Sequence, residues 1–104
     1  MTFKEDIVKR IKTDFGEESG KALKALYDAV KKTDYLETDI VIRCIIFLAN
    51  GNIEDLNKYI DAARIDTRDV MLWAEYEYLG SDSNYKRLHD FNKTFEECSN
   101  TIKE

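Results

Sequence analysis

Proline is absent from this chain of 104 residues, and glycine, cysteine and histidine are scarce, with four, two and one copies respectively. Without proline or a glycine- and serine-rich run, no segment has the composition of an interdomain linker. Two cysteines are too few for a disulfide scaffold, and one histidine does not supply the usual zinc-ligand spacings. We therefore expect a single domain over residues 1–104, a reducing, cytoplasmic location, no metal and no cofactor.

Long apolar runs are also missing. Residues 1–6 contain neither the apolar segment nor the cleavage site of a secretory signal. The longest apolar run, residues 40–49, is interrupted by Arg43 and is far shorter than the roughly 18 residues that span a bilayer. No association with a membrane is expected.

The sequence also lacks clusters of basic residues. The formal net charge is -5, and the whole excess lies in residues 53–104, where twelve acidic residues face seven basic ones. Nucleic-acid binding normally requires clustered lysine and arginine to contact the phosphates. We therefore expect no nucleic-acid partner, and any partner of the acidic half would be basic.

Apolar residues recur at spacings of three and four along the chain, which is typical of amphipathic helices. Residues with a side-chain acceptor precede these stretches, and Gly16, Gly51 and Gly80 follow three of them. The pattern predicts an all-α, compact single-domain bundle of about six short helices arranged as antiparallel helical hairpins. The expected helices cover about residues 2–15, 18–32, 38–49, 52–65, 66–79 and 82–102.

The third and fifth of these helices are apolar nearly all round, so we expect them to be central. The run at residues 40–48 is rich in β-branched residues and could also be a buried strand. A lone strand would leave its backbone groups without partners, so we favour the helix. The apolar faces predict a core that includes Ile45, Phe47, Leu56, Ile60, Trp73 and Phe95.

No catalytic arrangement is recognisable: there is no phosphate-binding glycine loop, no nucleophile elbow and no activated cysteine. Arg43 stands alone in an apolar run, four residues after Asp39, and a helical contact between these two is one interpretation. The other is that Arg43 contacts an anion or ligand. His89 is either a residue at the edge of the core or a second ligand contact.

The fifth helix has apolar residues on a second side. If the chain does not cover that side, Met71, Glu75, Glu77 and Tyr78 would form a partner-binding surface with an acidic rim. If it does, this helix is an ordinary core helix.

These features favour a small acidic, non-enzymatic helical module that binds another protein, as adaptor, regulatory or immunity-like proteins do. A small-ligand binder or enzyme, with a pocket between helices around Arg43 and His89, is the alternative. A third hypothesis is a homo-oligomer formed through the second apolar side of the fifth helix.

Overall fold

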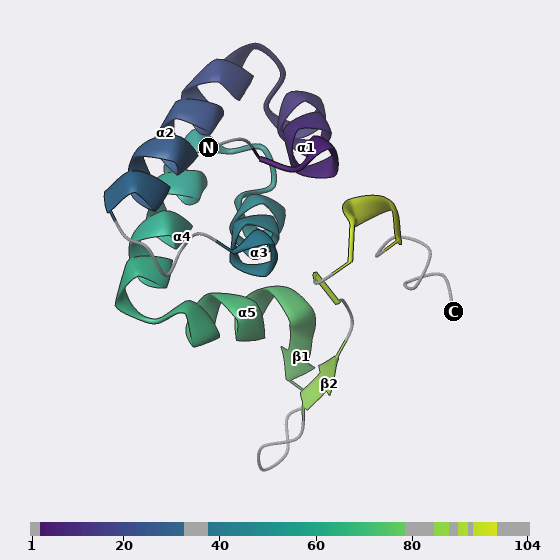
Figure 1. The fold of residues 1–104 in the computed structure, drawn as a ribbon. Helices are drawn as coiled ribbons and strands as arrows, with labels where there is room; N and C mark the ends of the chain where they lie inside the picture. Colours follow the sequence, from purple (N-terminus) through teal and green to yellow (C-terminus); the bar gives the residue numbers. More distant parts are fainter. Residues whose placement is uncertain (1–2, 33–37, 79–84, 88–89, 92, 98–104) are drawn as a thin grey trace.

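The computed structural model describes residues 3–32, 38–78, 85–87, 90–91 and 93–97, with the backbone alone for residues 77, 78 and 85–87. It confirms a compact all-helical bundle, whose Cα radius of gyration of 13.5 Å is close to the roughly 13 Å expected for a folded chain of 100 residues. The helices are α1 (Glu5–Phe15), α2 (Ser19–Lys32), α3 (Asp39–Ala49), α4 (Ile53–Ile65) and α5 (Thr67–Glu75). A short 3-10 turn, η1 (Gly16–Glu18), joins α1 to α2, which fold back on each other (Figure 1).

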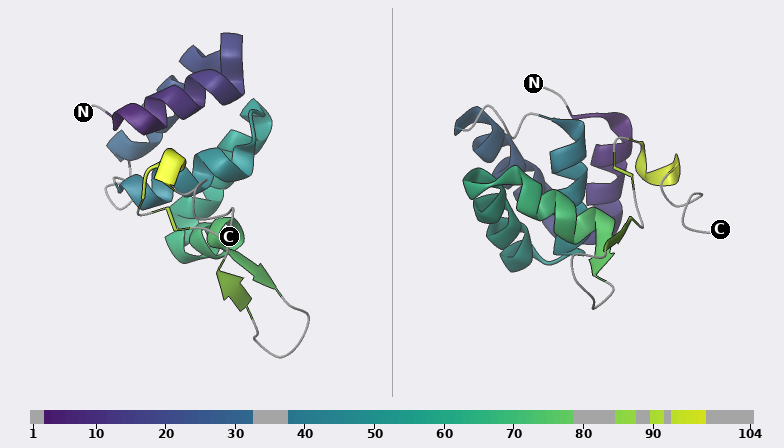
Figure 2. Two further views of the ribbon diagram at one scale, coloured as in Figure 1. Left: turned by 90° about the vertical axis from the view of Figure 1, so that its right-hand side faces the viewer. Right: turned by 90° about the horizontal axis from the view of Figure 1, so that it is seen from below.

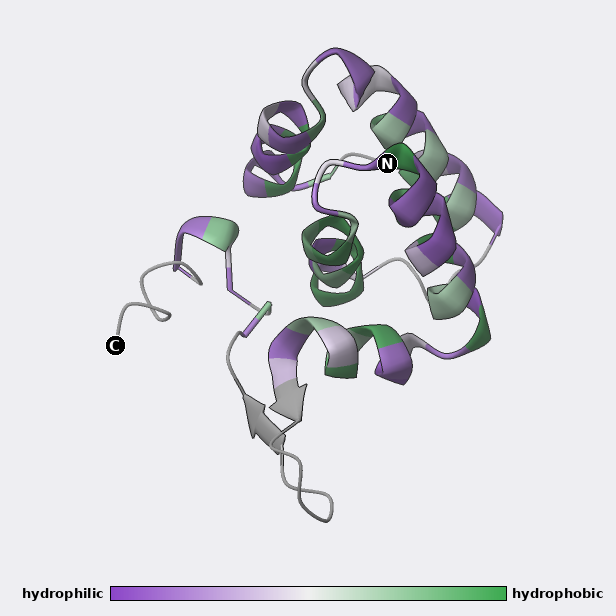
Figure 3. Ribbon diagram, turned by 180° about the vertical axis from the view of Figure 1, so that it is seen from behind, coloured by the Kyte–Doolittle hydropathy of each residue, from purple (hydrophilic) through white to green (hydrophobic). Residues whose placement is uncertain are grey.

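Helix α3 is the centre of the bundle, as the sequence predicts. Its start is capped by the Thr38 hydroxyl, which accepts a 3.4 Å hydrogen bond from the Val41 N–H. Its end is Asn50, in the left-handed conformation, as the Asn-Gly pair indicates. Residues 41–46 are all buried, and the ribbon of α3 is green nearly all round (Figure 3). The strand interpretation of residues 40–48 is wrong.

The other helices surround α3 and bury one side each. Helices α2 and α4 lie on one side of α3, α1 lies beside it, and α5 runs across the bundle beneath it (Figures 1 and 2). The predicted caps of α4 and α5 are confirmed: Asn52 accepts from the Asp55 N–H and Asp66 from the Arg68 N–H, both at 2.9 Å. Helix α1, however, begins at Glu5, later than the expected start near residue 2. Its N-cap position is occupied by Lys4, whose side chain makes no capping hydrogen bond.

The turn between α3 and α4 touches the end of α1. Gly51 has a positive φ of 82°, and a Cβ atom on it would lie 2.5 Å from the carbonyl oxygen of Asp14. Only glycine fits this close approach of two backbones. The turn thereby fixes the C-terminal end of α1 against the central hairpin of α3 and α4.

The end of the fold differs from the prediction. Helix α5 ends at Glu75, and strand β1 (Tyr76–Tyr78) pairs antiparallel with strand β2 (Tyr85–Arg87), with Tyr78 opposite Tyr85. The expectation of a helix over residues 82–102 is wrong at β2; within that range the described helical residues are 95–97. Tyrosines favour strands, and the intervening sequence Gly-Ser-Asp-Ser-Asn is rich in turn formers. Local hairpin formation therefore prevails over the apolar spacing of three and four.

The described residues after the hairpin, 90–91 and 93–97, lie along the side of α3 that α2 and α4 leave open (Figure 1). We call them the C-terminal strap. Phe91 and Phe95 of the strap are buried at 1% and 6% exposure, and the Phe91 ring packs 5.1 Å from that of Phe47. Both phenylalanines complete the core, so the predicted burial of Phe95 is confirmed. They belong to the strap, however, and not to the long helix that the sequence predicts. Within the described residues, no helix is long and apolar enough to cross a membrane.

Candidate functional site

Arg43 is buried on α3, with 4% of its surface exposed. Its Nε and Nη2 atoms each donate a 3.0 Å hydrogen bond to one carboxylate oxygen of Asp6 on α1. Its Nη1 atom donates to the carbonyl oxygen of Phe91, also at 3.0 Å. The expected pairing with Asp39 is therefore wrong: the partner of Arg43 comes from another helix, in the paired geometry that suits a guanidinium and a carboxylate.

Asp6 accepts a third hydrogen bond, from the backbone N–H of Phe95 at 3.1 Å. Burial on its own raises the pKa of Asp6. The hydrogen bonds from Arg43 and Phe95, together with the charge of Arg43, outweigh burial, so the pKa of Asp6 is lowered below its ordinary value. The carboxylate is thus held ionised between α1, α3 and the strap.

Glu75 is the last residue of α5 and is 2% exposed. Its Oε2 atom accepts a 2.7 Å hydrogen bond from the backbone N–H of Phe91. The prediction that Glu75 belongs to an exposed partner-binding surface is therefore wrong. Instead Asp6, Arg43 and Glu75, from three different helices, bind main-chain atoms of the strap. We call these three residues the strap anchor.

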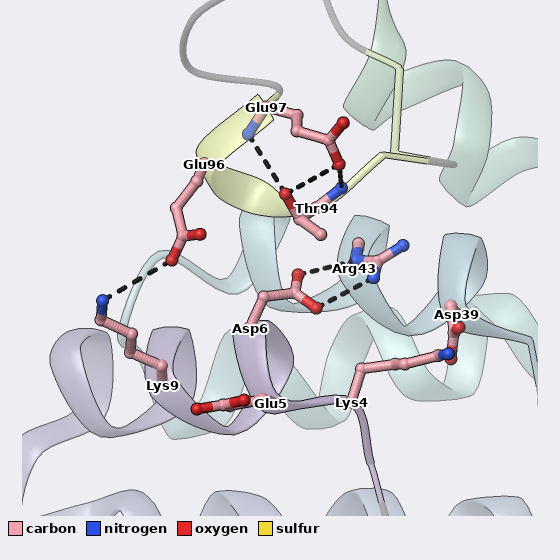
Figure 4. A pocket seen from close by; sticks show the side chains of 9 residues that line it. All are labelled: Lys4, Glu5, Asp6, Lys9, Asp39, Arg43, Thr94, Glu96 and Glu97. Carbon is pink, nitrogen blue, oxygen red and sulfur yellow. Dashed lines mark hydrogen bonds and ion pairs between the residues drawn. The ribbon is translucent and has the colours of Figure 1, made fainter.

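A surface depression of about 680 Å³ lies over Asp6 and Arg43 of the strap anchor (Figure 4). Its walls carry charges of both signs, and its lining residues are Lys4, Glu5, Asp6, Lys9, Asp39, Arg43, Thr94, Glu96 and Glu97. Lys9 pairs with Glu96 across it at 3.6 Å. The described part of the chain contains no group of His, Cys, Asp or Glu side chains placed to hold a metal.

Thr94 and Glu97 at the rim form a capping box that the sequence analysis missed. The Thr94 N–H and hydroxyl both donate to Glu97 Oε1, at 3.1 and 3.0 Å, and the Glu97 N–H donates to the Thr94 hydroxyl at 3.2 Å. The hydrogen bonds from the Thr94 backbone and hydroxyl lower the pKa of Glu97. The Thr-x-x-Glu spacing was the available signal for this helix start. The interaction caps the start of the helical turn at residues 95–97.

The remaining residues of the predicted sites are placed as follows. Met71 is half-buried and packs against the core, and its neighbour Ala74 is buried. Glu77 and Tyr78 belong to β1, and their side chains are outside the described structure. His89 also lies outside the described residues. The structure thus brings Arg43 and Glu75 to one buried cluster, which removes Glu75 from the expected surface centred on Tyr78.

The exposed side of α5 lies opposite the side that carries Ala74. Trp73 was expected in the core but is 50% exposed, and Tyr76, the first residue of β1, is 37% exposed. The Trp73 ring meets that of Tyr59 on α4 edge to face, with centroids 6.1 Å apart and planes at 63°. We call Tyr59, Trp73 and Tyr76 the aromatic face. Asp69, one helical turn before Trp73, was a sequence signal that this side meets solvent.

The surroundings of the aromatic face are charged. The Nζ atom of Lys58 lies 5.4 Å from the centroid of the Tyr59 ring. Asp55 and Asp69 are exposed, and each stands one helical turn before an aromatic residue of the face. The arrangement combines apolar rings, a ring that already accepts a cation, and acidic neighbours.

Comparison of the chain with protein-family models, with curated proteins and with solved structures finds no match.

Proposed function

We propose that this chain is a small, non-enzymatic module that binds another protein through the aromatic face, which is formed by α4, α5 and the start of β1. The observation that carries the proposal is the exposure of Trp73. Half of its surface is accessible to solvent, whereas several phenylalanines of the same chain are buried in the core. Tryptophan and tyrosine are enriched among the residues that contribute most to protein interfaces. Here the rings of Tyr59 on α4 and Trp73 on α5 are already in contact before binding.

The charge around the face favours a partner with a basic contact surface. Next to the face, Asp55 and Asp69 are exposed carboxylates, and Lys58 is the exposed cation that lies over the Tyr59 ring. Arg68, beside Asp69 in sequence, is paired with Asp66. Two carboxylates against one ammonium group leave an acidic rim that speeds the encounter with a positively charged protein. The same charge disfavours nucleic acid as the partner.

A small-ligand binder remains the alternative function, and the depression over the strap anchor is the observation in its favour. Its weakness is that Arg43 already donates three hydrogen bonds within the chain, two to Asp6 and one to Phe91. An anion entering the depression would have to compete with a buried carboxylate for the guanidinium. We therefore place the binding function on the aromatic face.

The test is capture of partners from the native host by the full chain and four variants, the fourth being Lys9→Ala in the depression. Trp73→Ala and Tyr59→Ala alter the aromatic face, and Lys12→Ala changes an exposed residue of α1 as the matched control. We expect one specific partner that is lost with both aromatic variants and retained with the control. A partner that survives both aromatic substitutions and is lost with Lys9→Ala would move the site to the depression.

A further inference from the structure

The chemistry around Trp73 allows the partner to be specified further, and this step rests on the function proposed above. Asp55 and Asp69 flank the aromatic face, and neither forms an ion pair among the described residues. Asp69 is attracted by the neighbouring Arg68, but that guanidinium is bound to Asp66. The two carboxylates therefore lie beside aromatic rings without a direct ion pair.

The chain itself shows that this environment accepts a cation. Lys58 lies over the Tyr59 ring at 5.4 Å, within the roughly 6 Å at which a cation is attracted to a ring face. Trp73, the better aromatic acceptor, is half exposed beside it. A cation placed on Trp73 would also be one helical turn from Asp69.

We infer that the partner presents an arginine side chain that lies on the Trp73 ring and pairs with Asp69. Arginine fits better than lysine for two reasons. Its planar guanidinium stacks on an aromatic ring while its N–H groups pair with a carboxylate in the same plane, and it is more weakly hydrated than an ammonium group. Asp55, beside Tyr59, favours a second basic residue next to the arginine.

The probe for this inference is a set of capped tetrapeptides of the form Gly-X-X-Gly, where X is arginine, lysine or citrulline. Citrulline has the shape of arginine without its charge. The chain contains one tryptophan, so the indole N–H signal in an NMR titration reports on Trp73 alone. The full chain is titrated with each peptide, and its Asp69→Asn variant with the arginine peptide.

We expect saturable shifts of the indole signal with the arginine peptide, affinity lower by about two- to fivefold for lysine, and no saturation for citrulline. Asp69→Asn should weaken the arginine peptide by about threefold, whereas Glu17→Gln, an exposed carboxylate of η1, should leave its affinity unchanged. Equal binding of arginine and citrulline peptides, or an unchanged affinity in Asp69→Asn, would overturn the inference. Neither result bears on the proposed function, which fails only if partner capture is insensitive to Trp73→Ala and Tyr59→Ala.

Discussion

Arg43 holds Asp6 through two parallel hydrogen bonds, from Nε to Oδ2 and from Nη2 to Oδ1, each 3.0 Å long. The two residues are 37 positions apart, and both side chains are less than 10% exposed, at 4% and 8%. Because Arg43 also binds the Phe91 carbonyl and Asp6 the Phe95 amide, this one ion pair connects α1, α3 and the strap.

Removing one partner of this pair should destabilise the fold strongly. Asp6→Ala leaves the Arg43 charge buried without its carboxylate, and we expect a loss of about 3–5 kcal/mol in the free energy of unfolding. The matched control is Asp61→Ala, which breaks an exposed pair with Arg64 and should cost less than about 1 kcal/mol. Denaturant unfolding measures both. Similar losses in the two variants would show that Arg43 and Asp6 are solvated.

The lowered pKa of Asp6 predicts a stability that depends on pH. Because its pKa is lower in the folded chain than in the unfolded one, at about 3.9, the stability contributed by Asp6 is complete above the unfolded value. It is lost as the pH falls through the folded value. The free energy of unfolding should therefore fall less steeply between about pH 5 and pH 2 in Asp6→Asn than in the original chain. Parallel pH profiles would contradict this role of Asp6.

A contact of this structure could be predicted from the sequence where its two partners are close together in the chain. The caps at Thr38, Asn52 and Asp66 lie within three residues of the N–H groups that they bind, and all three were predictable. Asp6 is 37 residues from Arg43, whereas Asp39 is one helical turn away, so a local analysis selects the wrong carboxylate.

The errors at the C-terminal end of the fold have the same origin. Phe91 and Phe95 have the spacing of a helix face, but they reach the core because Glu75 and Asp6 bind the main chain of the strap. Similarly, α5 has apolar residues on two sides, and periodicity alone does not say which side meets α3. The structure buries Val70 and Ala74 and exposes Trp73, which reverses the expectation for the aromatic side.

The exposure of Trp73 predicts a modest effect on stability. Trp73→Ala should cost about 1–2 kcal/mol, because only half of the side chain leaves a buried environment. Leu56→Ala, at a position with 0% exposure, should cost about 2–5 kcal/mol. The midpoints of thermal unfolding give the comparison. If Trp73→Ala were as destabilising as Leu56→Ala, the indole would be a core group and the aromatic face would lose its main residue.

Two glycines should respond in opposite directions to substitution by alanine. Gly20 lies in the first turn of α2 with no atom within 4 Å of an added Cβ, so Gly20→Ala should stabilise the chain by about 0.4–1 kcal/mol. Gly51 has a positive φ and a Cβ position 2.5 Å from the Asp14 carbonyl oxygen. Gly51→Ala should therefore destabilise it by more than about 1 kcal/mol. Stabilisation by both changes, measured by denaturant unfolding, would refute the contact between the α3–α4 turn and α1.

The central claim, that the aromatic face binds a protein, is tested most directly by photo-crosslinking in the native host. The full chain is produced with benzoylphenylalanine at position 73 or 76 of the aromatic face, at position 97 on the rim of the depression, or at the exposed position 12 of α1 as the control. We expect the same covalent adduct with one protein from positions 73 and 76, no adduct from positions 12 and 97, and loss of the position-76 adduct on Trp73→Ala. Adducts from position 97 with none from positions 73 and 76 would contradict the account.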